Sequence, residues 1–251
     1  MHVDVAADAA HAADLAASSI AVHLEDALSA RSHATLALSG GDTPALMFSR
    51  LASYGLPWHR VHVFQVDERA VPAGDAASNW PTLAPVARRV PRDHRHPMLG
   101  PDTDTDDESA LLEAANRYGS ELSRLCGAVP ALDVVHLGLG ADGHTASLPP
   151  GDPVVDVHDR SVALTQPFRG PRRLTLTRPV LDAAHCVVWL VTGTAKANVV
   201  AGLVQRDPQL VASRVARARA TLVVDAAAAA ILHGDSERQS PGGVTGWPPK
   251  D

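Results

Sequence analysis

The sequence predicts an α/β protein built on a doubly wound, mainly parallel sheet with helices on both faces. Short apolar or β-branched segments alternate with longer segments of helical periodicity along most of the chain, a pattern typical of βαβ units. Several apolar segments end in glycine and polar residues, and in open α/β sheets such loops meet at the carboxyl ends of the strands. We therefore expect the loops after residues 38, 66, 138 and 192 to gather along one edge.

The N-terminal part of the chain supplies the first strand and two helices. Residues 7–30 place aliphatic side chains at helical spacing among alanines and predict an amphipathic helix. Residues 34–38 predict a short apolar strand. A second helix is expected over residues 45–54, with Thr43 as its cap and Pro44 in its first turn.

The middle of the chain is expected to add two strands. Residues 61–66 are apolar and β-branched, and a helix is expected to begin near Ser78-Asn79. Residues 90–108 are rich in proline and predict a loop. Residues 111–125 have helical periodicity, and the acidic residues before them suit a helix N-terminus. Residues 132–136 predict the next buried strand.

The C-terminal part is expected to complete the sheet. Alternating residues predict a strand over 172–177, and residues 179–184 suffice for one helical turn. Residues 186–191 form a wholly apolar strand, after which a helix is expected from Ala195. The last strand and the last helix are expected over residues 221–224 and 226–232.

Length and composition limit the possible classes of protein. The 251 residues predict a single domain over residues 1–233 and a disordered tail, rich in glycine, proline and serine, over residues 234–251. A net charge of -6 argues against nucleic-acid binding. Cys126 and Cys186 have no CxxC spacing, which argues against a disulfide framework and a zinc site. With no signal-peptide pattern and no apolar run of the ~20 residues that span a bilayer, we expect a cytoplasmic protein without membrane contact.

The strongest chemical signal lies directly after the strand at residues 132–136. The stretch is Leu137-Gly138-Leu139-Gly140-Ala141-Asp142-Gly143-His144-Thr145-Ala146-Ser147. Its glycines permit close approaches that a side chain would block, and an acid, an imidazole and hydroxyls follow them. A tight turn with Asp142 or Thr145 as a helix cap is the alternative. The imidazole of His144 favours a functional site.

Two further loops have the composition of anion sites. Ser39-Gly40-Gly41-Asp42-Thr43 follows a strand and precedes a helix, so its backbone N–H groups could hold a small phosphate group. Thr192-Gly193-Thr194-Ala195-Lys196 repeats the arrangement, with Lys196 expected in the first helical turn, where the helix dipole disfavours a cation. A plain helix cap and a solvated lysine are the alternatives. Because Lys196 and Lys250 are the only lysines in the chain, a ligand role is favoured.

Two arginines and the remaining histidines have ordinary explanations. Arg173 could be an exposed charge at a strand edge, and Arg69 could form a local salt bridge with a neighbouring acid. We expect His94 and His96 to be solvated in their loop and His62 and His136 to be packed within strands.

An acidic segment matches part of a calcium-binding loop. Positions 1, 3, 5 and 12 of the pattern correspond to Asp102, Asp104, Asp106 and Glu113. The sixth position is Asp107, where an EF-hand requires glycine. No metal site is therefore expected, and no other His, Cys, Asp or Glu set has a recognised metal spacing.

Taken together, these motifs resemble the 6-phosphogluconolactonase family. The resemblance covers about residues 5–232 and rests on motifs in the family's order and spacing. They are Ser39-Gly40-Gly41-Asp42-Thr43-Pro44, Asp67-Glu68-Arg69-Ala70-Val71-Pro72 with Ser78-Asn79, Gly138–Ser147, Arg173-Leu174-Thr175-Leu176-Thr177 and Thr192–Ala197. The family is related to glucosamine-6-phosphate isomerase/deaminase and shares its modified Rossmann-like sheet.

The resemblance implies hydrolysis of 6-phospho-D-glucono-1,5-lactone to 6-phosphogluconate in the oxidative pentose phosphate pathway. It implies a general base, His144, that works without metal or other cofactor. It implies phosphate binding by the Ser39–Thr43 loop, Arg173 and Lys196, and substrate contact by Arg69. The remaining candidate residues are Asp142 and Asp67 in catalysis and Gly140 and Gly143 in substrate binding.

Deaminase relatives carry a glutamate soon after the Asp-Gly-His motif. The corresponding segment here, Ser147-Leu148-Pro149-Pro150-Gly151, has no acid, which favours the lactonase. Pro149 stands where lactonases usually have phenylalanine. Two alternatives remain open: an amino-sugar-phosphate isomerase or deaminase, and a non-catalytic sugar-phosphate-binding protein. We expect a monomer rather than an oligomer.

Lactone hydrolysis needs an activated water, a stabilised oxyanion and a fixed substrate. A neutral imidazole is suited to take a proton from water near neutral pH. The phosphate serves as a handle whose binding energy holds the carbonyl in front of the water. Backbone N–H groups of the 140–144 turn or Arg69 could stabilise the oxyanion. Asp142 could orient either the loop or His144.

Overall fold

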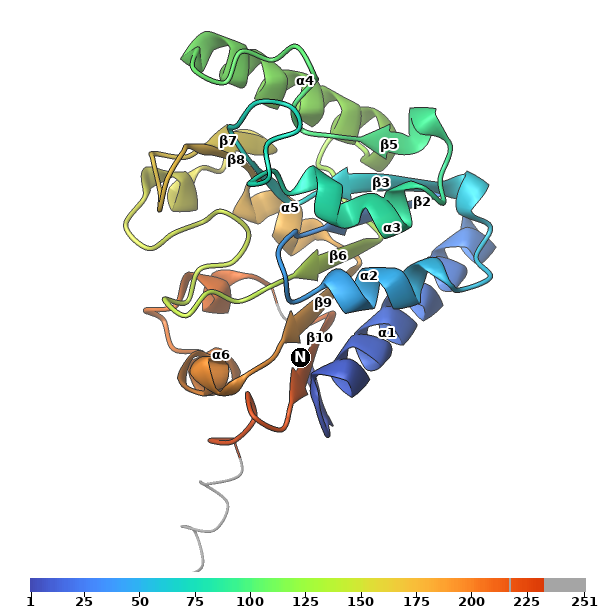
Figure 1. The fold of residues 1–251 in the computed structure, drawn as a ribbon, viewed down its shortest axis with the longest axis vertical. Coiled ribbons are helices and arrows are strands. Elements are labelled where there is room, and N and C mark those ends of the chain that lie inside the picture. The colour runs from blue at the N-terminus through green and yellow to red at the C-terminus, as the bar shows by residue number, and fades with distance from the viewer. Residues whose placement is uncertain (217, 233–251) are drawn as a thin grey trace, which may run out of the picture.

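The computed structural model describes residues 1–216 and 218–232, and within them the chain forms a parallel seven-stranded sheet and an antiparallel three-stranded sheet. The strands are β1 (His2–Ala6), β2 (Ala34–Leu38), β3 (Val61–Gln65), β4 (Asp67–Arg69), β5 (Arg95–His96), β6 (Val134–Leu137), β7 (Val162–Leu164), β8 (Arg173–Leu176), β9 (Cys186–Val191) and β10 (Ala220–Asp225). The α-helices are α1 (Ala9–Ala30), α2 (Ala45–Ala52), α3 (Ala84–Ala87), α4 (Glu108–Cys126), α5 (Arg178–Ala183) and α6 (Ala197–Gln205). The large sheet has the order β1-β10-β9-β6-β2-β3-β5 and the small sheet the order β4-β8-β7 (Figure 1).

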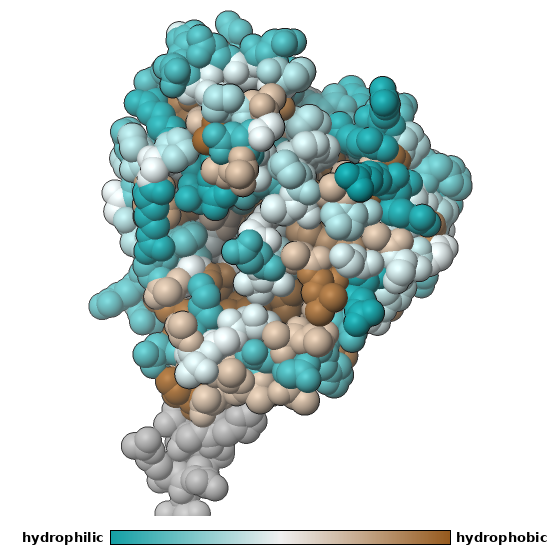
Figure 2. Space-filling view, in the orientation of Figure 1, coloured by the Kyte–Doolittle hydropathy of each residue, from teal (hydrophilic) through white to brown (hydrophobic). Residues whose placement is uncertain are grey.

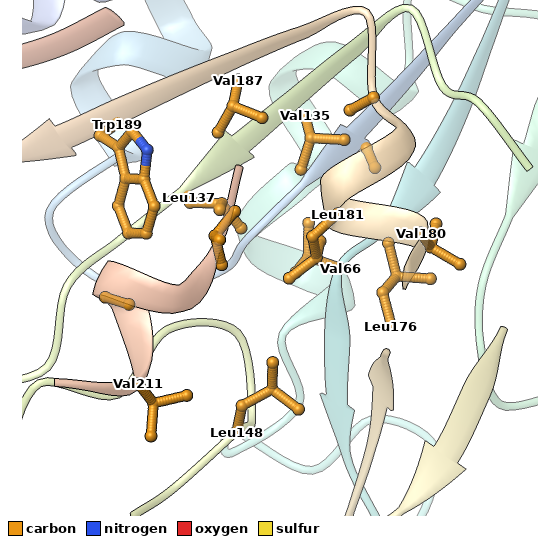
Figure 3. Close-up of a cluster of buried hydrophobic side chains, with 14 of the residues drawn as sticks. Val66, Val135, Leu137, Leu148, Leu176, Val180, Leu181, Val187, Trp189 and Val211 are labelled. Carbon is orange, nitrogen blue, oxygen red and sulfur yellow. The ribbon is translucent and has the colours of Figure 1, made fainter. Parts of the chain in front are cut away.

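Helices cover both faces of the large sheet, which confirms the predicted fold class. Successive strand residues point to opposite faces, so Val134 belongs to the buried cluster that includes residues of α1, α2 and α3, and Val135 to the cluster that includes residues of α4, α5 and α6. Figure 3 shows Val135 and Val187 of the sheet on the side of Leu181 from α5. The cores on the two faces use mainly alanine, valine and leucine, as the low aromatic content requires.

The expected loop over residues 90–108 contains an edge strand, and one histidine expectation there is wrong. β5 pairs in parallel with β3, which buries His96 to 7% exposure instead of leaving it solvated. Its Nε2 lies 3.0 Å from Nδ1 of His62, and its ring stacks on Phe64. Burial lowers the pKa of both His62 and His96 to about 4. His62 and His136 are packed within their strands, as expected.

The small antiparallel sheet is not predicted by the sequence pattern. Asp67-Glu68-Arg69 follows the strand expected over residues 61–66 and forms β4, which pairs with β8. Val66 joins the two sheets: its N–H donates to Leu38 O in the large sheet at 3.0 Å, and its carbonyl accepts from Leu176 N in the small sheet at 2.8 Å. The alternation around Arg173 predicts a strand but carries no information about its partner.

Several helix boundaries differ from expectation. Residues 226–232 form turns rather than a helix, although Asp225 Oδ1 accepts from Ala228 N at 2.8 Å as a helix cap would; a helix this short gains little from propensity alone. α2 begins at Ala45 with Pro44 at its cap position and no capping hydrogen bond from a side chain, so Thr43 is not its cap. Lys196 ends a 3₁₀ turn, Thr194–Lys196, and occupies the cap position before α6.

The strands β1 and β7 lie in segments for which no strand is expected. β1 forms the edge next to β10, and β7 completes the small sheet beside β8. The expected tail over residues 234–251 lies outside the described residues. None of the helices in the described part of the chain has both the length and the apolar character needed to cross a membrane.

Candidate active site

The predicted loops gather around one cavity of about 300 Å³. The cavity lies beyond the carboxyl ends of β2, β6 and β9, and the small sheet forms its other side. Candidate residues that line it are Ser39, Gly40, Gly41, Asp42, Thr43, Asp67, Arg69, Gly140, His144, Arg173 and Lys196. Asp142 and Gly143 are not among the lining residues. Figure 2 shows this face of the molecule hollowed near its middle and bordered by hydrophilic and hydrophobic residues.

His144 and Asp142 form a close pair at the cavity wall. Nδ1 of His144 lies 2.5 Å from Oδ1 of Asp142, which also accepts from the His144 backbone N–H at 3.3 Å. Burial is the largest influence on Asp142 and acts to raise its pKa, but the hydrogen bonds and charge of His144 and the charge of Arg169 together outweigh it, so the pKa is lowered. An ionised carboxylate only accepts, so Nδ1 of His144 is the donor in this contact, and Nε2 of a neutral ring would be left to accept a proton. A pair of this kind can serve as an oriented general base.

Two glycines allow the tight turn that carries this pair. Gly143 has φ +82°, and a Cβ there would meet Leu210 Cδ2 at 2.5 Å. A Cβ on Gly140 would lie 2.1 Å from His144 Nδ1. The turn is closed by the hydrogen bond from Gly140 N to His144 O at 2.8 Å. Both glycines are therefore required for the position of the imidazole ring.

Asp67 is buried and faces the cavity from the small sheet. Its Oδ2 accepts from Ser147 Oγ at 2.6 Å, and Ser147 Oγ lies 3.4 Å from Arg173 Nη1. Burial raises the pKa of Asp67, while Ser147 and Arg173 act in the opposite direction. Asp67 is thus held within a hydrogen-bonded group separate from the pair formed by His144 and Asp142.

Glu68 organises the loop that follows β4. It accepts hydrogen bonds from the backbone N–H groups of Arg69, Asn79 and Trp80 and from Ser78 Oγ. The suggested salt bridge of Arg69 with Asp67 or Glu68 is wrong, because the Arg69 guanidinium donates to Ala77 O instead.

Cationic side chains surround the cavity of this acidic protein. Arg69 and Arg173 come from the small sheet, Arg169 from the β7–β8 loop and Lys196 from the turn before α6. Burial lowers the pKa of Arg173 and Lys196. Lys196 Nζ donates to Leu139 O at 2.5 Å, while Arg173 Nε has no hydrogen-bond partner among the described residues. This concentration of positive charge suits an anionic ligand.

The Ser39–Thr43 loop borders the cavity on the side of the large sheet. Ser39 Oγ is buried and has no hydrogen-bond partner within the described part of the chain. Gly40 packs so closely against Asn79 that a Cβ would lie 2.7 Å from it, and Gly41 has φ +111°. The loop leads into the N-terminus of α2. Backbone and hydroxyl donors are thus available for an anion here.

Sequence reasoning missed Phe168, Arg169 and the cavity position of His136. Phe168 and Arg169 lie in the β7–β8 loop, which has no local motif to mark them. His136 lines the cavity, whereas its position in a strand indicates only packing. Pro149 does not line the cavity. Within residues 1–216 and 218–232, no group of three or more His, Cys, Asp or Glu side chains is placed to hold a metal ion.

Comparison with known proteins settles the family. The family described as glucosamine-6-phosphate isomerases/6-phosphogluconolactonase matches residues 7–224. The chain belongs to this family. It is 34% identical over 210 residues to a 6-phosphogluconolactonase of Synechocystis, covering 81% of this chain and 86% of that protein. It is 35% identical over 208 residues to the 6-phosphogluconolactonase of Caulobacter vibrioides, covering 78% and 84%.

Solved structures of family members have the same fold. The structure of 6-phosphogluconolactonase from Trypanosoma cruzi superposes with a TM-score of 0.81 at 26% identity, covering 92% of this chain and 97% of that one. A monomeric glucosamine-6-phosphate deaminase superposes with a TM-score of 0.74 at 18% identity, covering 92% and 100%. The second likeness concerns the fold alone.

Proposed function

We propose that this protein hydrolyses 6-phospho-D-glucono-1,5-lactone to 6-phosphogluconate, the activity named for the Synechocystis relative, and so serves the oxidative pentose phosphate pathway. The observation that carries the proposal is the pair formed by Asp142 and His144 at the wall of a cationic cavity. This reaction requires a base next to the attacking water and cations that bind the phosphate group. The absence of an acid from residues 147–151 also argues against the deaminase reaction.

The phosphate group positions the substrate. Arg173, Lys196 and the donors of the Ser39–Thr43 loop hold the phosphate, and Arg69 contacts the sugar lactone. Charge-assisted hydrogen bonds to phosphate contribute about 1.5–3 kcal/mol each. This binding energy fixes the lactone carbonyl in front of His144, so that attack by water becomes effectively unimolecular.

His144 then activates the water. Nε2 accepts a proton while the water oxygen forms a bond to the lactone carbonyl carbon, and the carbonyl oxygen becomes an oxyanion. Backbone N–H groups of the 140–144 turn, or Arg69, stabilise that charge. The intermediate collapses by breaking the bond to the ring oxygen, which takes the proton back from His144 and becomes a hydroxyl. Asp142 stabilises the transient imidazolium.

A direct assay tests this function. Freshly generated 6-phosphogluconolactone is supplied, 6-phosphogluconate is measured, and spontaneous hydrolysis is subtracted. The wild type should be active, and His144→Asn and His144→Ala should lower kcat by about 10²–10⁴ with little change in KM. His59, which is exposed and remote from the cavity lining, provides the control His59→Asn.

The alternatives predict different results. Ammonia release from glucosamine 6-phosphate without lactone turnover would identify a deaminase, and substrate binding without either reaction would identify a binding protein. A folded His144→Asn protein with most of its turnover would exclude His144 as the base, leaving Asp67 or Asp142. We further propose a monomeric, cytoplasmic enzyme, which size-exclusion chromatography and cell fractionation test.

A further inference from the structure

The β7–β8 loop brings two side chains to the proposed base. The Phe168 ring meets the His144 ring edge-on, with 5.5 Å between centroids. The adjacent Arg169 places Nη2 3.0 Å from Oδ2 of Asp142. Neither residue belongs to a motif of the sequence, and neither contact is expected from it.

The two carboxylate oxygens of Asp142 have different partners. Oδ1 accepts from His144, through Nδ1 at 2.5 Å and the backbone N–H at 3.3 Å. Oδ2 accepts from Arg169. With both oxygens engaged, the carboxylate cannot rotate without losing one of these contacts. The orientation of the imidazole ring therefore depends on a chain of contacts that runs from Arg169 through Asp142 to His144.

The backbone of Arg169 has a conformation that is unusual for a residue other than glycine. Its φ is +51°, in the left-handed region that disfavours a residue with a Cβ, and Gly170 follows at φ +123°. The side chain is 61% exposed, and its guanidinium also lies over the Phe168 ring, 5.2 Å from the centroid. Strained backbone of this kind persists where the surrounding contacts maintain it, and it clusters at functional sites.

Other cations near the site are engaged elsewhere. Lys196 Nζ donates to Leu139 O, and Arg173 lies against the Phe168 ring and Ser147. Arg69 donates to Ala77 O. Among the described residues, Arg169 is the cation that contacts Asp142.

We propose that Arg169 is a positioning residue for the hydrolytic reaction: it fixes Oδ2 of Asp142 so that Oδ1 holds the His144 ring in the orientation in which Nε2 faces the water. The inference rests on the proposed function, in which His144 is the base. Arg169 does not need to touch the substrate. Its contribution should therefore appear in kcat, and it should be independent of the phosphate group.

The test compares Arg169→Ala and Arg169→Lys with Arg172→Ala. Arg172 is the neighbouring arginine, pairs with Glu108 at 2.6 Å and is absent from the cavity lining, so it is a matched control. Arg169→Ala should lower kcat by about tenfold and change KM by less than about twofold. General-base catalysis accelerates the reaction by about 10²–10⁴-fold, and part of that acceleration depends on the orientation of the imidazole ring. Arg169→Lys should restore part of the loss, and Arg172→Ala should match the wild type.

Two further comparisons separate positioning from substrate binding. Arg169→Ala should slow hydrolysis of phosphorylated and unphosphorylated gluconolactone by the same factor. In an Asp142→Asn background, Arg169→Ala should have little additional effect, because the carboxylate through which it acts has been removed.

Several outcomes would overturn the inference while leaving the proposed function intact. The first is an Arg169→Ala variant as active as an active wild type. The second is a loss of activity that is seen only with the phosphorylated lactone or only in KM. The third is a loss of kcat that has the same size in the wild-type and Asp142→Asn backgrounds. A wild type without lactonase activity would overturn the proposed function and this inference with it.

Discussion

Replacing His136 by leucine should make the free energy of unfolding less sensitive to acid. His136 is 1% exposed, and neither ring nitrogen has a hydrogen-bond partner among the described residues. Burial lowers its pKa to about 3, although the Ser39 backbone acts in the opposite direction. In the unfolded chain the ring binds a proton near pH 6.5. As the pH falls below 6.5, the unfolded state therefore binds the proton first, and the native state is destabilised.

The size of the effect follows from these two values. Between pH 7 and pH 5, protonation of the unfolded imidazole lowers the free energy of unfolding by about 2 kcal/mol, since the native ring stays neutral until about pH 3. His136→Leu removes this contribution and leaves all other titrating groups in place. The difference in unfolding free energy between variant and wild type should thus move by about 2 kcal/mol in favour of the variant over that range.

Urea unfolding followed by circular dichroism at pH 7, 6 and 5 measures this difference, with linear extrapolation to water at each pH. His59→Gln supplies the control, because it removes an imidazole from an exposed position. A difference between His136→Leu and wild type that stays constant from pH 7 to pH 5 would refute the claim that His136 is held neutral.

Two other predictions concern the cavity. Arg173→Ala and Lys196→Ala should each lower kcat/KM for the phosphorylated lactone by about tenfold to hundredfold and affect unphosphorylated gluconolactone little; equal losses on both lactones would show that neither residue holds the phosphate. Gly140→Ala should lower kcat by at least about tenfold, because its Cβ would lie 2.1 Å from His144 Nδ1. Gly138→Ala should retain most activity, because a Cβ at Gly138 would have no neighbour within 4 Å. Equal activity of the two variants would show that the close approach of His144 to residue 140 does not require glycine.

The parts of the site that could be predicted are those with local signals. The Ser39–Thr43 loop, His144 and Lys196 each follow an apolar strand, and parallel strands bring their carboxyl ends to one edge. Their convergence on one cavity therefore follows from the alternation of strands and helices. Gly140 and Gly143 can also be identified from the sequence, because a turn with close backbone approaches requires glycine.

The parts that could not be predicted depend on contacts between distant segments. Arg169 meets Asp142 across 27 positions of sequence, and nothing in its neighbourhood distinguishes it from Arg172. The burial of His96 comes from a two-residue strand, which is too short to leave a periodic pattern. The helix expected over residues 226–232 does not form, although both the alanines and the hydrogen bond from Ala228 N to Asp225 favour one. A segment of seven residues is too short for propensity to decide its structure.

The hydrogen bonds of Val66 have a consequence for how the molecule opens. Because one residue pairs with Leu38 through its N–H and with Leu176 through its carbonyl, separating the two sheets disrupts the main chain on both sides of that residue. The amide protons of Val66 and Leu176 should then exchange with solvent through the same cooperative opening, and later than those of the β7–β8 loop. The two walls of the cavity, one on each sheet, are thereby joined into a single unfolding unit.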